Sequence, residues 1–106
     1  MPRLSHAIQT NFVFFAKESG GDIGVVYNGD SSFVRAELHV KVQKRFLLVF
    51  WSDVSEWSGT STERYGSFSH TFALDGSGMY RAVFTLKIYG TDGTYDLVEE
   101  TIESKY

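Results

Sequence analysis

The sequence predicts an all-β protein that folds as one antiparallel sandwich of about seven strands. Apolar and polar residues alternate with a period of two over long stretches, and no stretch keeps the 3.6-residue period of an amphipathic helix. Clusters of Gly, Asp, Asn and Ser recur about every ten residues, as turns between short strands do. The single Pro lies at position 2, outside the alternating stretches, so no predicted strand is interrupted.

The first two predicted strands lie at residues 8–15 and 23–27. Their sequences, IQTNFVFF and IGVVY, are rich in β-branched and aromatic residues, which favour strands. The turn-like sequence ESGGD separates them, and NGDSS follows the second. These turn sequences bound both strands and keep them short.

The two strongest predicted strands span residues 33–43 and 79–89. In both, the even-numbered positions are apolar and most odd-numbered positions are polar, which indicates a strand with one buried face. The predicted core residues are Val34, Ala36, Leu38, Val40 and Val42 in the first strand, and Tyr80, Ala82, Phe84, Leu86 and Ile88 in the second.

Three further segments complete the predicted sandwich. Residues 46–57 contribute at least one strand, residues 67–74 another, and residues 95–103 a weaker last strand. Within residues 67–74, Phe68, His70, Phe72 and Leu74 share the apolar face. The pair Asp92-Gly93 predicts a hairpin turn before the last strand, because both residue types tolerate positive φ.

Composition limits the protein to one domain, residues 1–106, and excludes several functions. The 42% of hydrophobic residues can build one core, and a net charge of −3 disfavours nucleic-acid binding. The absence of Cys excludes a disulfide and a Cys-based metal site, and we expect no cofactor. The longest apolar runs, residues 12–16 and 46–51, are far shorter than the roughly 20 residues that span a bilayer. We therefore expect no membrane insertion.

The segment LDGSGMY, residues 74–80, predicts a tyrosine corner, in which the phenol at the start of a core strand bonds back to the preceding loop. Tyr80, Ala82 and the DGSG sequence before them resemble the start of the equivalent strand in immunoglobulin-like domains. Ala82 stands where antibody domains have a Cys. The resemblance therefore implies an immunoglobulin-like antiparallel β-sandwich without a disulfide.

A second resemblance extends over residues 41–96. The sequences VQK, WSDVSEWSG and GMYRAVFTLKIYGTDGTYD together resemble small secreted immunoglobulin-like proteins of Gram-positive bacteria. The resemblance implies a secreted or cell-surface location with a signal peptide removed, although a cytoplasmic location also fits a chain without Cys. That group of proteins has no assigned activity, so no function follows from it. This chain differs at RFLLVFW, where such proteins usually have a short polar turn.

The three histidines show no metal-binding pattern. His6, His39 and His70 lie on separate segments without the spacing of metal ligands. His70 lies on an apolar face between Phe68 and Phe72. A histidine there is either a buried pH-sensitive base or a histidine of the core or its rim that bonds to the backbone, and the second interpretation is favoured.

Acidic residues and serines also show no catalytic pattern. The acids of residues 96–103 lie on a predicted solvated strand, where charge discourages aggregation between sheet edges. Turn chemistry explains the Asp residues beside Gly better than calcium binding does. No Gly-x-Ser-x-Gly sequence is present. We therefore expect no metal site and no enzymatic activity.

Two surfaces are candidates for binding. Six consecutive apolar residues cannot all face one core in a strand, so we predict a protein interface, first of all a homodimer, at Phe46, Leu47, Leu48, Val49, Phe50 and Trp51. The competing explanation is that the N-terminal segment covers this run. The alternative function is a carbohydrate-binding module that stacks sugars on Trp57, Tyr65 and Tyr89, although a sandwich core normally buries one Trp.

The sequence thus predicts a non-enzymatic extracellular or cell-surface binding or structural module. Its specificity is not readable from the residues, because sandwiches carry many unrelated functions.

Overall fold

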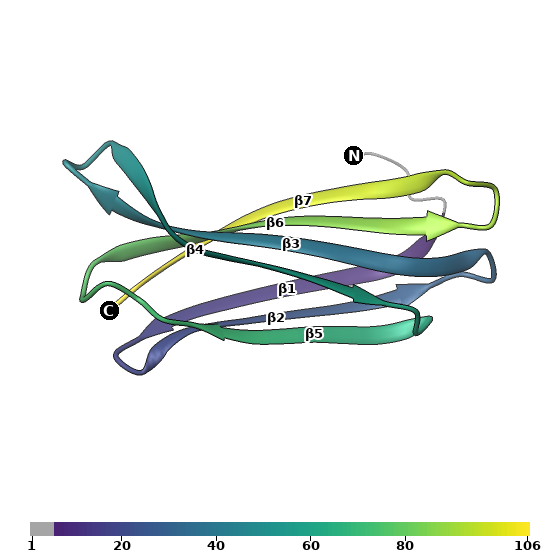
Figure 1. Cartoon of the computed structure of the whole chain (residues 1–106), viewed down its shortest axis with the longest axis horizontal. Helices are drawn as coiled ribbons and strands as arrows, with labels where there is room; N and C mark the ends of the chain where they lie inside the picture. The colour runs from purple at the N-terminus through teal and green to yellow at the C-terminus, as the bar shows by residue number, and fades with distance from the viewer. Residues whose placement is uncertain (1–5) are drawn as a thin grey trace.

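Seven antiparallel strands form two sheets packed face to face in the computed structural model, which describes residues 6–106 (Figure 1). No helix occurs in that range. The strands are β1 (Ala7–Lys17), β2 (Gly20–Gly29), β3 (Phe33–Phe46), β4 (Phe50–Ser61), β5 (Tyr65–Phe72), β6 (Met79–Gly90) and β7 (Tyr95–Lys105). The all-β sandwich predicted from the alternating pattern is therefore confirmed.

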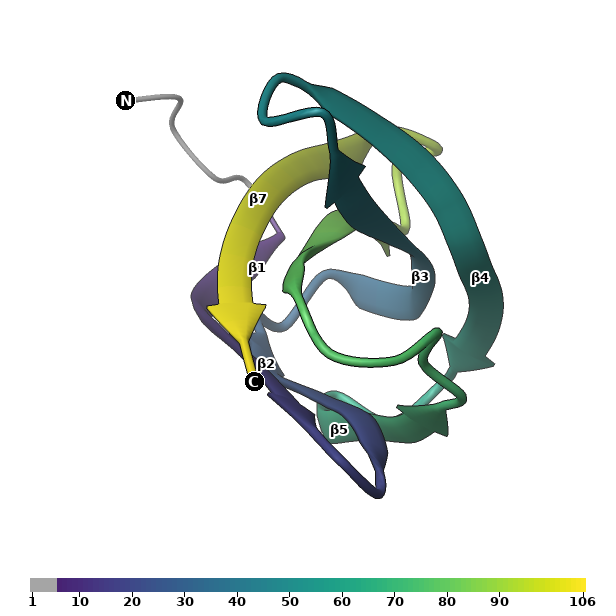
Figure 2. The ribbon, with the colours of Figure 1, turned by 90° about the vertical axis from the view of Figure 1, so that its left-hand side faces the viewer.

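One sheet has the strand order β1-β2-β5 and the other β4-β3-β6-β7. Three hairpins, β1–β2, β3–β4 and β6–β7, remain within a sheet, while the other connections cross between the sheets. Seen along the long axis, β1 lies beside β7 and β4 approaches β5 (Figure 2). The molecule is elongated, with extents of 45 × 25 × 17 Å, so its two ends are far apart.

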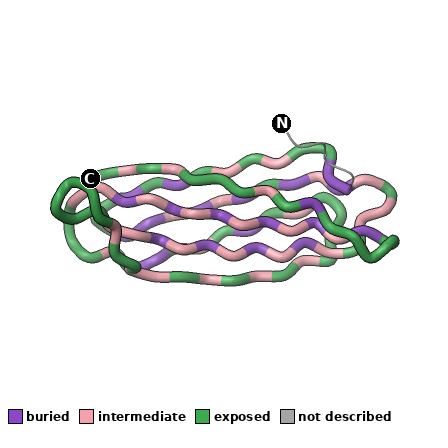
Figure 3. The backbone as a smooth tube through the Cα atoms, turned by 90° about the horizontal axis from the view of Figure 1, so that it is seen from above, coloured by how far each residue is buried: buried purple, intermediate pink, exposed green. Residues whose placement is uncertain are grey.

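The core lies between the sheets and is supplied largely by β3 and β6. Burial alternates along these strands, as Figure 3 shows, because successive side chains of a strand point to opposite faces. The five predicted core residues of β6 are completely buried, and four of those predicted in β3 are buried. The fifth, Val34, is 40% exposed. A register shift between Phe33 and Arg35 turns Phe33 toward the core in its place.

The predicted tyrosine corner is present. The hydroxyl of Tyr80 donates a 2.6 Å hydrogen bond to the carbonyl oxygen of Gly76, four residues earlier. Burial raises the pKa of the Tyr80 phenol, which keeps the hydroxyl in its donor form. The predicted hairpin turn at Asp92-Gly93 is also present, and Gly93 has a φ of 82°. The local sequence therefore predicted both the tyrosine corner and the Asp92-Gly93 turn correctly.

Removing the Tyr80 hydroxyl tests the contribution of this corner. We expect Tyr80→Phe to lower the free energy of unfolding by about 1 kcal/mol, because one hydrogen bond is lost while the ring stays packed. Urea denaturation measures the change. Tyr65→Phe, which removes a hydroxyl from a Tyr that is mostly exposed, is the control. Equal effects of the two substitutions would show that the corner contributes nothing specific.

Candidate binding site at the hairpin tip

The apolar run forms the tip of the β3–β4 hairpin, so the prediction of a strand across this run is wrong. β3 ends at Phe46 and β4 begins at Phe50, and these two residues pair across the hairpin. Leu47, Leu48 and Val49 form the turn. Strand alternation cannot apply to a turn, so all three point into solvent. We call residues 46–50 the apolar tip.

The backbone of the apolar tip is unusual for leucine. Leu47 has a φ of 51° and Leu48 a φ of 70°, both in the left-handed region. A hairpin turn with positive φ at consecutive positions favours Asn-Gly, because a side chain with a Cβ is strained there by roughly 1–2 kcal/mol per residue. Two leucines therefore occupy the positions where they disfavour the turn most.

The apolar tip is exposed to solvent. Leu48 is 81% and Leu47 76% exposed, and the rings of Phe46 and Phe50 stack on each other at a centroid distance of 5.5 Å. In Figure 1 the hairpin projects beyond the neighbouring strands at the left end of the molecule. Burying one side chain of this size is worth about 1.5–3 kcal/mol. Five such side chains thus form a concentrated apolar surface.

Basic and aromatic residues lie directly behind the apolar tip. The guanidinium group of Arg81 lies 4.2 Å from the ring centroid of Trp51, and its Nε donates a 2.7 Å hydrogen bond to Gln43. Arg45 is exposed and pairs with Trp51 in the β3–β4 register. The Nζ of Lys44 donates a hydrogen bond to the carbonyl oxygen of Asp75. We call Lys44, Arg45, Trp51 and Arg81 the collar.

The predicted interface residues thus lie together, but they divide between two environments. Residues 46–50 form the exposed tip, whereas Trp51 is partly buried beneath Arg81. The described part of the N-terminal segment does not cover the tip, because β1 begins at the opposite end of the molecule (Figure 1).

The three residues of the carbohydrate alternative have separate neighbours. Trp57 packs against the core and stacks on the ring of His70 at 4.8 Å. Tyr65 begins β5 in the three-stranded sheet, whereas Tyr89 belongs to β6 in the four-stranded sheet. The ring of Tyr89 also lies 3.8 Å beneath the guanidinium group of Arg35. A shared stacking platform is therefore not supported by this arrangement.

The outer face of the four-stranded sheet holds a shallow polar hollow of about 270 Å³. None of the three predicted carbohydrate-stacking rings lines it. His39 contributes to this hollow, and its Nε2 lies 2.8 Å from a carboxylate oxygen of the exposed Glu56. The hollow is lined by Glu37, Leu38, His39, Ser58, Gly59, Thr60, Thr85 and Lys87.

The ring of His70 lies among aromatic side chains, stacked on Trp57 and perpendicular to Phe72 at 4.7 Å. The burial of His70 is intermediate, so the residue lies at the rim of the core. The carboxylate of Asp53 accepts a 2.8 Å hydrogen bond from Gln43, which lowers the pKa of Asp53.

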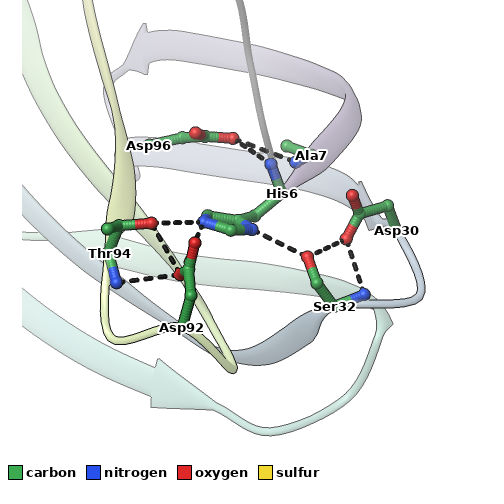
Figure 4. Close-up of polar contacts among 7 residues, drawn as sticks. All are labelled: His6, Ala7, Asp30, Ser32, Asp92, Thr94 and Asp96. Atoms are coloured by element: carbon green, nitrogen blue, oxygen red, sulfur yellow. Dashed lines mark hydrogen bonds and ion pairs between the residues drawn. The ribbon is translucent and has the colours of Figure 1, made fainter.

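A polar cluster around a buried histidine, which sequence reasoning missed, lies at the other end of the molecule (Figure 4). His6 is 4% exposed. Its Nδ1 lies 2.7 Å from the hydroxyl of Ser32, and its Nε2 lies 2.8 Å from the hydroxyl of Thr94. Its backbone N–H donates a 2.7 Å hydrogen bond to Asp96. We call these residues, with Asp30 and Asp92, the histidine cluster.

In the histidine cluster, the hydroxyl groups of Ser32 and Thr94 each donate a hydrogen bond to a carboxylate. Ser32 donates to Asp30 at 2.5 Å and Thr94 donates to Asp92 at 2.7 Å. Ser32 and Thr94 therefore each connect a ring nitrogen of His6 to a carboxylate, that of Asp30 on one side and that of Asp92 on the other. Within residues 6–106, every buried side-chain nitrogen or oxygen has a hydrogen-bond partner. The cluster thus ties the start of β1 to the β2–β3 and β6–β7 turns.

Two repeated turn sequences were the signal that could have revealed this cluster. Asp30-x-Ser32 and Asp92-x-Thr94 each place a carboxylate two residues before a hydroxyl, as turns of this kind do. The sequence contains both, but nothing in the pattern places them beside each other or beside His6.

No group of His, Cys, Asp and Glu side chains within residues 6–106 is arranged to hold a metal ion. The same range contains no helix of the length and apolarity needed to cross a membrane. Comparison with protein-family models, curated proteins and solved structures finds no match, so the candidate sites rest on the sequence and geometry of this chain.

Proposed function

We propose that the protein is a non-enzymatic binding module that attaches to an apolar target through the apolar tip. The observation that carries this proposal is the pair Leu47 and Leu48, which are exposed and held in left-handed conformations. Such residues lower the stability of the turn without filling the core. A binding role explains why apolar side chains occupy these positions.

The fold is consistent with an immunoglobulin-like module. The strand order and the Tyr80 hydrogen bond support this assignment. A secreted or cell-surface location, suggested by the resemblance to Gram-positive proteins, would place the apolar tip where an external target can reach it. Both assignments are part of the proposal.

Self-association through the apolar tip alone is less well supported than attachment to a different target. A stable protein interface buries roughly 800 Å² on each partner and involves about 20–30 residues. The tip offers five side chains. A homodimer would need additional contacts outside the tip.

Replacing the strained leucines tests the proposal. We expect Leu47→Asn combined with Leu48→Gly to raise the free energy of unfolding by about 1–2 kcal/mol, because these residues suit the left-handed turn. The same variant should lose retention on a butyl-substituted matrix. Urea denaturation and hydrophobic-interaction chromatography at fixed salt measure the two effects.

Phe15→Thr provides the matched control, because Phe15 is an exposed apolar residue on β1 outside the tip. This control should keep the retention of the parent. If the double substitution destabilises the protein, the leucines are structural and the proposal fails. Unchanged retention would show that the apolar tip is not the attachment surface.

A further inference from the structure

We infer that the target of the apolar tip is the surface of an anionic lipid bilayer. This inference rests on the proposed function and names the partner of the same site. Attachment would be peripheral, with the tip entering only the boundary between headgroups and acyl chains. Such attachment needs no segment that crosses the bilayer, and the apolar runs of this sequence are too short to do so.

The order of residues along the hairpin matches the layers of a bilayer surface. The outermost residues, 46–50, carry only apolar side chains. Next comes the collar, in which Trp51 has an apolar ring with one polar group and three residues are basic. Trp is favoured at the level of the headgroups, and Lys and Arg are favoured near anionic lipid. The polar body of the sandwich follows.

The chemistry of the apolar tip suits a fluid apolar target better than a protein surface. None of its five side chains donates or accepts a hydrogen bond, whereas protein interfaces surround an apolar centre with polar contacts. The turn is also narrow and projects from the body (Figure 1). A projecting finger needs a deep pocket in a protein partner, but a bilayer accommodates it without a preformed shape.

The charged residues next to the apolar tip are basic, and the acidic residues on the strands of this end lie further back. Lys44, Arg45 and Arg81 form the basic part of the collar, but Asp53 and Asp75 also lie near it, and the exposed Glu103 pairs with Arg81 in the β6–β7 register. Lys44 and Arg45 lie closer to the apolar tip than the row of paired residues that holds Asp53, Arg81 and Glu103. Asp53 accepts a hydrogen bond from Gln43, and its carboxylate lies 3.6 Å from Nζ of Lys41. Arg45 is exposed directly behind Phe46. The protein carries a net charge of −3, so the local basic collar would orient this end toward the membrane.

Vesicle binding tests the inference with defined probes. The parent protein is sedimented with vesicles of neutral phosphatidylcholine and with vesicles that also contain phosphatidylserine. We expect at least about tenfold tighter binding to the anionic vesicles, weakened by added salt. The Leu47→Asn and Leu48→Gly double variant should lose about tenfold or more of this binding, while Phe15→Thr should not.

Two further variants locate the contact. Arg45→Gln should reduce the preference for anionic vesicles, whereas Lys87→Gln, a charge removed from β6 outside the collar, should preserve it. Binding should shift Trp fluorescence to shorter wavelength and allow quenching by brominated lipid. Trp51→Phe should abolish both signals, because Trp57 is packed against the core.

The outcomes separate this inference from the proposed function. If vesicles of both kinds fail to bind while retention on the butyl matrix still depends on the tip, the bilayer inference is wrong and the partner is a protein. If neither vesicle binding nor retention depends on the tip, both proposals fail. Equal binding to neutral and anionic vesicles would overturn the role assigned to the collar.

Discussion

Phe84→Ala is expected to lower the free energy of unfolding by about 3–5 kcal/mol, the effect of removing a fully buried aromatic ring. Phe84 lies on β6 at the centre of the four-stranded sheet, and its ring meets that of Phe12 from the opposite sheet at 5.1 Å. The loss is large because a cavity would form where the two sheets are joined. A domain of this size has only about 5–15 kcal/mol of stability in total.

Phe46→Ala is the matched control for this prediction. Phe46 is the same residue type, but it lies in the apolar tip with 46% of its surface exposed. We expect its replacement to change stability by less than about 0.5 kcal/mol and to weaken retention on the butyl matrix. Thermal and urea denaturation compare the variants. A comparable loss of stability in both would mean that the tip belongs to the core.

His6→Ala is expected to lower the free energy of unfolding by about 2–4 kcal/mol. The substitution removes two side-chain hydrogen bonds, to Ser32 and Thr94, and leaves a hole where the ring packed. His39→Ala is the matched control, because His39 pairs with Glu56 on the solvent-exposed outer face. That control should change stability by no more than about 0.5 kcal/mol.

Gly90 makes the role of the His6 ring separately testable. A Cβ at position 90 would lie 2.2 Å from Cε1 of the ring, so Gly90→Ala should expel His6 from the cluster. In a protein that already carries His6→Ala, the same methyl group has room. The double-mutant cycle should therefore show a coupling energy of about 1–3 kcal/mol. Additive effects would contradict direct packing of the ring on Gly90.

The histidine cluster should also give a characteristic acid dependence. Hydrogen bonds from Ser32 and Thr94 hold the pKa values of Asp30 and Asp92 below the usual value for Asp. The folded state therefore binds fewer protons than the unfolded state at these residues, and stability falls as pH drops. Their contribution should be complete above about pH 4, where an unfolded Asp is ionised, and should disappear as the pH passes the lower folded values.

A double variant, Asp30→Asn with Asp92→Asn, isolates that contribution. The difference in stability between the parent and this variant should be constant from neutral pH down to about pH 4 and should shrink below it. Urea titrations across this range measure the difference. A difference that does not change with pH would show that these carboxylates are not the groups that titrate.

Sequence reasoning succeeded where a local pattern determines the outcome. The alternation in residues 79–89 predicted every core residue of β6, because strand geometry alone sends successive side chains to opposite faces. The tyrosine corner and the Asp92-Gly93 turn were predicted for the same reason, since each depends on residues close in the chain. Val34 was assigned wrongly because a register shift interrupts the alternation at the start of β3.

The apolar run shows why local pattern has limits. Six consecutive apolar residues suggested a strand, because leucines are rarely found in a left-handed turn. Pairing of β3 with β4 on both sides of the run decided otherwise, since the register places Phe46 opposite Phe50. The many paired residues of the β3–β4 hairpin thus offset the backbone strain of its turn.

By itself, the sequence determined the class of fold, most of the core and the presence of an apolar surface, because these depend on residue type and short-range periodicity. Tertiary structure alone decided that the apolar surface is an exposed tip with a basic collar. It also decided that His6 meets Ser32 and Thr94, which are 26 and 88 residues away in the chain. Contacts between distant turns depend on strand pairing and sheet packing, and these leave no signal in any one segment.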